Sequence, residues 1–185
     1  MNRLTELGAE LHQEGENWNA ADILARAACQ ADPKAKYLNP FDDPLLWTGH
    51  ASVVHEISKK LKPDMIICSA GGGGLFNGIR QGLREAYDED GDLVPVVVAE
   101  TIGCDSLNQA IKNSTEGFKI PGITSIAKSL GSTVASSKSY EETLKTNTHS
   151  ATVSDAETIV AIRQLCETER VLVEPACAVE RSQKT

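Results

Sequence analysis

The chain has 185 residues, of which 41% are hydrophobic, and a formal net charge of −8 at pH 7. This length fits one ordinary domain, or one domain with a piece of another, and the apolar content is sufficient for a packed core. An acidic chain with 4% aromatic residues and no stripe of lysine or arginine is a poor candidate for binding nucleic acid. The composition therefore argues against wholesale disorder and against a nucleic-acid partner.

The cysteines and the N-terminus bear on the cellular compartment. The five cysteines are odd in number and irregularly spaced, with no Cys-x-x-Cys pair, which is typical of reduced thiols in a reducing compartment. No apolar run approaches the ~20 residues of a membrane span, and the first residues lack the apolar segment and cleavage site of a secretory signal. We therefore expect a cytoplasmic protein with no membrane association.

The N-terminal part of the chain predicts two helices. Residues 19–31 place apolar side chains at helical spacing, with Asn19 as N-cap and with Asp32 and Pro33 ending the helix. Residues 36–44 are short, extended and broken by two prolines. Residues 49–61 predict a second helix, with lysines near its C-terminus, where the helix dipole favours positive charge.

The rest of the chain alternates between predicted strands and helices. The β-branched run at 94–100 predicts a strand that is buried on both faces. Ser154 and Glu157 form the pattern of a capping box at the start of a later helix. The further predicted elements are strands at 64–70 and 170–174, helices at 75–87, 106–113 and 154–169, and an acidic turn at 88–95. This order indicates an α/β fold with a parallel sheet and flanking helices.

Four consecutive glycines, Gly71–Gly74, separate the strand at 64–70 from the next helix. A strand that ends in glycines and opens a helix favours an anion, because backbone N–H groups and the positive end of the helix dipole point outward there. A Walker A loop is excluded, since no Gly-Lys-Ser/Thr follows. A dinucleotide fingerprint lacks its third glycine, although Glu100 supplies its acidic residue, so that interpretation is weakened and not eliminated. A tight turn without a ligand is the plain alternative.

Six segments in order resemble the catabolic L-serine/L-threonine dehydratases, which are pyridoxal-phosphate (PLP) enzymes of the tryptophan-synthase-β fold type (type II). The resemblance covers residues 8–178 and includes the tetraglycine segment "PDMIICSAGGGGLFNGIRQGL". The other segments are "EGENWNAAD", "YLNPFDDPLLWTGHASVVHEI", "VVVAETIGCDSLNQAI", "ITSIAKSLGS" and "RVLVEPACA". Ordered matches over most of the chain are far more specific than any single glycine pattern.

The resemblance implies a cofactor site and a cation site. Backbone amides of the tetraglycine loop would hold the 5′-phosphate of pyridoxal 5′-phosphate, and these residues are Gly71, Gly72, Gly73 and Gly74. A potassium-like monovalent cation would bind the carboxylate of Glu100 and the backbone carbonyls of Cys104, Leu130 and Ser132, since hard cations prefer oxygen ligands. From spacing alone, a buried or capped carboxylate at a strand end is the better interpretation of Glu100.

The resemblance also implies a reaction. The family eliminates the β-hydroxyl group of L-serine to give an enamine, which yields pyruvate and ammonia, and it converts L-threonine to 2-oxobutanoate in the same way, in amino-acid catabolism that feeds gluconeogenesis. Its full-length members are typically homodimers. The lysine that binds the cofactor lies in a Ser-x-Lys-x-Arg-Gly segment, which does not occur in this chain. The Cys-Gly-Gly-x-Asn strand that faces the cofactor ring is absent as well. No catalytic residue is therefore assigned.

These matches imply a domain organisation and leave alternatives open. Residues 1–60 would be the rear part of the small domain, 61–178 a partial cofactor-binding large domain, and 179–185 a divergent tail. We expect a truncated form of the enzyme, with sheet edges and core surface left uncovered. The first alternative is a non-catalytic binding or regulatory fragment that associates with an intact homologue. The second is a nucleotide-binding α/β module that uses the glycine loop.

Two further groups of polar residues are weighed against ordinary structural roles. By resemblance, Phe41, Asp42 and Asp43 lie near the family's domain crossing, and a solvated turn is the plain alternative. His50 and His55 are five residues apart, not at the four-residue spacing of a helical metal pair, so we interpret both as structural.

Overall fold

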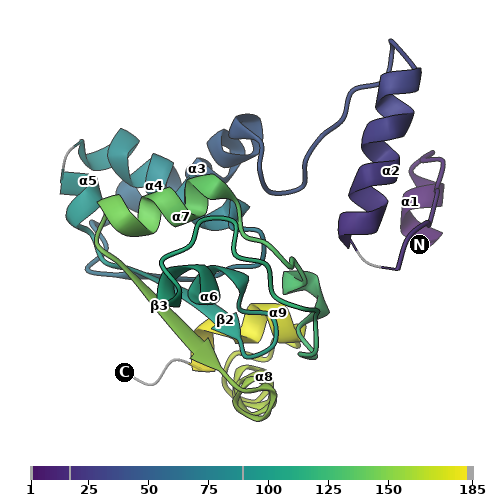
Figure 1. Cartoon of the computed structure of the whole chain (residues 1–185). Coiled ribbons are helices and arrows are strands. Elements are labelled where there is room, and N and C mark those ends of the chain that lie inside the picture. The colour runs from purple at the N-terminus through teal and green to yellow at the C-terminus, as the bar shows by residue number, and fades with distance from the viewer. Residues whose placement is uncertain (1, 17, 89, 183–185) are drawn as a thin grey trace. The chain divides into compact units, whose positions relative to one another are not determined.

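The computed structural model describes residues 2–16, 18–88 and 90–182. Its contacts divide the chain into two units, one ending at Leu38 and one beginning at Asn39. The first unit contains α1 (Asn2–Glu6) and α2 (Trp18–Ala31) (Figure 1). The helix predicted at 19–31 is confirmed and ends before Asp32 as expected. It begins at Trp18, however, so Asn19 lies in its first turn and is not the N-cap.

Within this first unit, the residues after α2 fold back onto the helix. The Tyr37 hydroxyl donates a hydrogen bond to Asp22, and the Arg26 guanidinium lies 4.2 Å from the centre of the Tyr37 ring. Asp22 also accepts a 2.9 Å hydrogen bond from Arg26. Polar and cation–π contacts thus hold the extended segment against α2.

The second unit contains a three-stranded parallel sheet in the order β1-β2-β3. The strands are β1 (Ile66–Ser69), β2 (Val96–Thr101) and β3 (Thr148–Val153). Its helices are α3 (Pro44–Ser58), α4 (Gly74–Tyr87), α5 (Asp90–Leu93), α6 (Ser106–Lys112), α7 (Ser137–Lys145), α8 (Asp155–Glu169) and α9 (Pro175–Ala178), with 3₁₀ turns at Lys128–Leu130 and Glu180–Ser182. The predicted α/β class with a parallel sheet is confirmed.

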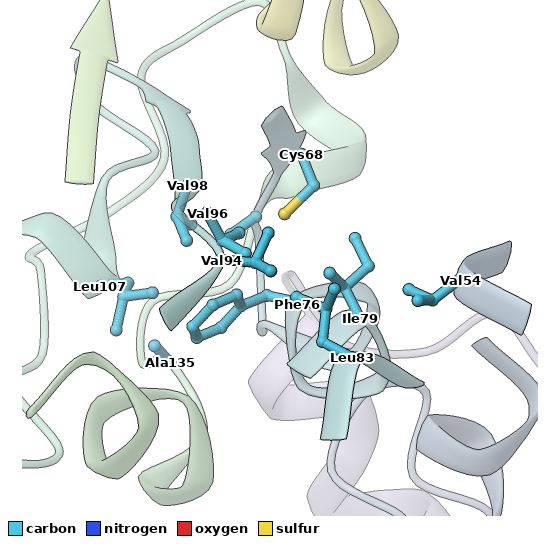
Figure 2. Close-up of a cluster of buried hydrophobic side chains, with 11 residues drawn as sticks. Val54, Cys68, Phe76, Ile79, Leu83, Val94, Val96, Val98, Leu107 and Ala135 are labelled. Atoms are coloured by element: carbon cyan, nitrogen blue, oxygen red, sulfur yellow. The ribbon is translucent and has the colours of Figure 1, made fainter. Parts of the chain in front are cut away.

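Side chains alternate between the two faces of the sheet, and each face has its own core. Val96 and Val98 pack with Phe76 and Leu83 of α4 in one buried cluster (Figure 2). On the opposite face, Ala99 belongs to a second cluster that includes Ala176 of α9 and the adjacent Val179. Figure 1 shows α4 and α7 on one side of the sheet and α8 and α9 on the other. This two-sided burial explains the continuous β-branched run of β2.

Helices α3 and α4 approach each other closely at two glycines of α4. A Cβ atom on Gly78 would overlap the His50 side chain, and one on Gly82 would lie 2.7 Å from the carbonyl oxygen of Ala51. His55 adds a 2.8 Å contact from its Nε2 to the carboxylate of Glu85. Both histidines therefore lie in the α3–α4 pair, and their interpretation as structural residues stays a prediction.

Several secondary-structure predictions differ from the structure. The strand expected at 170–174 is wrong, because Arg170 takes a left-handed conformation (φ 59°) at the end of α8 and no described residue of 171–174 is in a strand. The third strand is instead the polar segment Thr148–Val153, whose backbone pairs with β2. The acidic turn at 88–95 contains the one-turn helix α5, and α7 was not predicted.

The predicted domain limits at residues 60 and 178 stay a prediction. Within the second unit, residues after 178 pack against the sheet: Val179 is buried, and the Glu180 carboxylate accepts a 3.0 Å hydrogen bond from the backbone N–H of Ser69. Among the described residues, no helix combines the length and the apolar character needed to cross a membrane.

Candidate functional site

The glycine loop joins the end of β1 to the start of α4. Gly73 is the N-cap of α4 and has a φ of 97°, a conformation that glycine adopts at little cost. Because Gly73 has no side chain, the N-cap residue makes no side-chain capping hydrogen bond. Throughout the described parts of the chain, no hydrogen bond is recorded from the backbone N–H of Gly71, Gly72, Gly73 or Gly74. The loop therefore presents a set of unpaired donors at the positive end of a 14-residue helix.

The inner side of the loop is packed against other segments of the chain. A Cβ atom on Gly71 would lie 2.8 Å from the carbonyl oxygen of Leu130, and one on Gly72 would overlap the ring of Phe41. At Gly73 a Cβ would overlap the hydroxyl of Ser139. These contacts show that the glycines are required by the protein's own packing, as well as by any ligand on the outer side.

Beneath the loop lies a buried polar cluster that the sequence did not point to. Asn77 of α4 contacts Ser136 and Ser139 at the start of α7, and the backbone N–H of Ser136 donates to the carbonyl of Gly72 at 3.0 Å. Nothing in the local sequence marks these residues, because they lie about sixty positions apart and come together only when α7 packs on α4.

Glu100 is buried at the end of β2, and both of its carboxylate oxygens accept hydrogen bonds. The donors are the backbone N–H groups of Leu107, at 3.0 Å, and Asn108, at 2.7 Å. Burial raises the pKa of Glu100 to about 8, against the opposing effect of these two hydrogen bonds. The structure thus shows a capped carboxylate at a strand end, and the predicted role of Glu100 in binding a cation stays a prediction.

The other three residues of the predicted cation site lie in two neighbouring turns. Cys104 and Leu130 share one buried cluster, in which the Cys104 thiol lies 3.7 Å from the carbonyl oxygen of Ala127. The Ser132 hydroxyl donates to the carbonyl of Val134 at 2.6 Å. Close to Glu100 in sequence, Ser106 Oγ and Asn108 Oδ1 are buried oxygen atoms for which no partner is found in the described structure. The described residues contain no group of three or more His, Cys, Asp or Glu side chains fit for a metal.

The segment before α3 has a structural function of its own. Asp43 is the N-cap of α3, and its carboxylate accepts a 2.9 Å hydrogen bond from the backbone N–H of Leu45. The Asn39 side chain accepts hydrogen bonds from the backbone N–H groups of Phe41, at 3.0 Å, and Asp42, at 2.8 Å. This turn sets the Phe41 ring against Gly72, so the segment helps to shape the glycine loop.

This arrangement suits a phosphate group. Unpaired amides at a helix N-terminus, with no side chain to block them, can hold a dianion through several charge-assisted hydrogen bonds. At the end of β1, the Glu180 carboxylate accepts a hydrogen bond from the backbone N–H of Ser69. The loop, rather than the region of Glu100, is therefore the strongest candidate for a ligand site.

Comparisons with known proteins agree with this geometry. Residues 1–181 match the family described as "Pyridoxal-phosphate dependent enzyme". The chain is 40% identical over 177 residues to L-serine dehydratase/L-threonine deaminase from Rattus norvegicus. The matched region covers 95% of this chain and 48% of that protein. The chain thus spans about half the length of the curated relatives that it matches.

Solved structures show the same fold. An L-serine ammonia-lyase from the fungus Rhizomucor miehei superimposes with a TM-score of 0.88 at 34% identity, covering 98% of this chain and 56% of that one. A threonine deaminase isoform from Solanum lycopersicum superimposes with a TM-score of 0.86 at 20% identity, covering 98% of this chain and 48% of that one, and supports the fold alone. The fold is tryptophan-synthase-β-like, and the chain belongs to the family of pyridoxal-phosphate dependent enzymes.

Proposed function

We propose that this chain forms the phosphate-binding part of an L-serine ammonia-lyase, which converts L-serine to pyruvate and ammonia and also L-threonine to 2-oxobutanoate. The observation that carries the proposal is the set of unpaired amides of Gly71–Gly74 at the start of α4, in a chain similar to an L-serine dehydratase. When bound, PLP supplies an electron sink for the elimination of the β-hydroxyl group.

The residues of this chain would bind and orient the cofactor. The amides of Gly71, Gly72, Gly73 and Gly74 would donate to the phosphate oxygens, and the dipole of α4 would favour their negative charge. Phe41 and the backbone of Leu130 pack against the loop and keep its inner side closed. A rigid anchor of this kind fixes one end of the cofactor, so that its reactive end is held in one place.

The proposal includes a monovalent cation near the loop. Glu100 would offer its carboxylate, while Cys104, Leu130 and Ser132 would offer backbone carbonyls. Two features support it: the region is rich in buried oxygen atoms, including Ser106 Oγ and Asn108 Oδ1, and Leu130 lies directly against Gly71. A cation there would stiffen the turn that supports the phosphate loop.

Assembly of the complete protein as a homodimer and its location in the cytoplasm are parts of the same proposal.

Phosphate recognition can be tested with two ligands that lack the reactive aldehyde. The chain is titrated with 4-deoxypyridoxine 5′-phosphate and with 4-deoxypyridoxine, and binding is followed by isothermal titration calorimetry. We expect the phosphorylated ligand to bind more tightly than 4-deoxypyridoxine, because the loop amides recognise the phosphate. Equal binding of the two ligands, or tighter binding of ATP or NAD than of the phosphorylated ligand, would contradict the proposal and favour the nucleotide-binding alternative.

The reaction itself can be tested in a chimera. This chain replaces the segment of the rat L-serine dehydratase/L-threonine deaminase that it matches, and pyruvate release from L-serine is measured with and without added PLP. We expect PLP-dependent release of pyruvate. A folded chimera that binds PLP and releases no pyruvate from L-serine would argue against the assignment to serine.

A further inference from the structure

The carbonyl groups of the glycine loop are held by donors from inside the protein. The Gly72 carbonyl accepts a 3.0 Å hydrogen bond from the backbone N–H of Ser136, and the Gly73 carbonyl accepts one of 2.9 Å from the backbone N–H of Asn77. In a planar trans peptide, the C=O and the following N–H point in opposite directions. The N–H groups of Gly73 and Gly74 are therefore turned away from Ser136 and Asn77, toward the outer side of the loop.

A closed set of side-chain hydrogen bonds holds these inner donors in place. Asn77 Nδ2 donates to Ser136 Oγ at 3.1 Å, and Ser139 Oγ donates to Asn77 Oδ1 at 2.9 Å. Ser136 is also the N-cap of α7, and its hydroxyl accepts from the backbone N–H of Ser139 at 3.1 Å. All three side chains are buried, with 3%, 4% and 0% of the surface of Asn77, Ser136 and Ser139 exposed.

Ser139 also acts directly on the shape of the loop. Its hydroxyl occupies the space that a Cβ atom on Gly73 would need, so α7 packs against the one residue of the loop with a positive φ. A buried network in which every member has a partner is rigid, and donors that are oriented before binding need no rearrangement when the ligand arrives.

We infer that Asn77, Ser136 and Ser139 are positioning residues that orient the Gly73 and Gly74 amides toward the cofactor phosphate. This inference rests on the proposed function. It assigns a ligand-related role to α7, a helix that carries none of the glycines and begins more than sixty residues after the loop. The network acts on the phosphate alone, so its loss should leave binding of the pyridine ring unaffected.

The test compares Ser139→Ala and Ser136→Ala with the wild-type chain. Each variant is titrated with 4-deoxypyridoxine 5′-phosphate, with 4-deoxypyridoxine and with inorganic phosphate, and its thermal unfolding midpoint is recorded without ligand. We expect each variant to bind the two phosphate ligands about fivefold more weakly, which corresponds to the loss of one hydrogen bond, with no change for 4-deoxypyridoxine. If Ser139→Ala does not fold, Ser136→Ala carries the test, because it leaves the bond between Ser139 and Asn77 intact.

Two further variants serve as controls. Ser137→Ala removes an exposed hydroxyl from the same turn of α7 and should bind like the wild type. Ser136→Thr keeps a capping hydroxyl and should restore phosphate binding. A lower unfolding midpoint with unchanged phosphate affinity, or an equal loss for all ligands, overturns the inference while leaving the proposed function in place. If the wild-type chain binds 4-deoxypyridoxine 5′-phosphate and 4-deoxypyridoxine with equal affinity, both the proposed function and this inference are overturned.

Discussion

The Glu100 carboxylate accepts a 2.7 Å hydrogen bond from the backbone N–H of Asn108, so the end of β2 caps helix α6. The N-cap residue of α6, Asp105, makes no capping hydrogen bond with its own side chain. The first N–H groups of a helix lack partners within the helix, and Glu100 satisfies two of them from a neighbouring strand. The residue expected to bind a cation therefore also anchors α6 to the sheet.

This relationship predicts a dependence of stability on pH. The folded protein holds the proton of Glu100 up to a pKa of about 8, whereas the unfolded chain releases it near 4.5. The folded state binds more protons in this interval, so the free energy of unfolding should fall as the pH rises from about 4.5 to about 8 and then level off. Urea unfolding in buffers free of potassium and sodium measures this fall, and Glu100→Gln should remove it.

The substitution has an effect of its own, and added potassium provides the matched test. In Glu100→Gln, the side-chain NH₂ group would face one of the two backbone N–H donors, so the free energy of unfolding should fall by about 1 kcal/mol at pH 5 to 6. A cation bound at Glu100 favours the ionised carboxylate, so potassium chloride should stabilise the wild type near pH 8 more than tetramethylammonium chloride does. The same pH slope in both proteins would show that Glu100 does not control it.

Replacement of Gly73 by alanine should both destabilise the fold and weaken phosphate binding. Gly73 has a φ of 97°, and a Cβ atom there would overlap the Ser139 hydroxyl. We expect Gly73→Ala to lower the free energy of unfolding by about 2 kcal/mol or more. The control is Gly117→Ala, because Gly117 also has a positive φ (68°) but, apart from its chain neighbours, no described atom lies within 4 Å of its Cβ position. An equal decrease in the free energy of unfolding of the two variants would mean that the Ser139 side chain moves aside freely.

Glu142 should stabilise the pairing of α7 with α4. Its buried carboxylate contacts the Arg84 guanidinium, with Nη1 to Oε1 at 3.0 Å, and the Lys138 ammonium at 2.7 Å. Burial alone would raise the pKa of Glu142, but the hydrogen bonds from Arg84 and Lys138 outweigh it and the pKa is lowered. Glu142→Gln should therefore lower the free energy of unfolding by about 2 kcal/mol at neutral pH, as measured by urea unfolding.

The pH profile separates this charge effect from a packing effect. Because the pKa of Glu142 is lower in the folded protein, its stabilisation is present above pH 4.5 and is lost as the pH falls through the folded-state pKa. The difference between Glu142→Gln and the wild type should therefore shrink in acid. Glu141→Gln, at the more exposed neighbouring position, should change stability little. A difference that is constant with pH would assign the effect to packing.

Helix boundaries could be predicted where their signals are local. The capping box of Ser154 and Glu157 is present, and α2 ends before Asp32 and Pro33 as expected. The strand Thr148–Val153 could not be predicted, since its sequence, Thr-His-Ser-Ala-Thr-Val, is mostly polar. Its conformation comes from backbone pairing with β2, and that pairing depends on a segment some fifty residues earlier in the chain.

The strand–glycine–helix unit around Gly71–Gly74 and the α/β class follow from local patterns in the sequence, and the resemblance to the dehydratases follows from its ordered motifs. The residues that lie against the glycines, namely Phe41, Leu130 and Ser139, and the capping of α6 by Glu100 become visible only in the folded chain. Caps, turns and periodicity arise between near neighbours in the chain, whereas these contacts form between segments thirty or more residues apart or across a strand end, when sheet and helices pack.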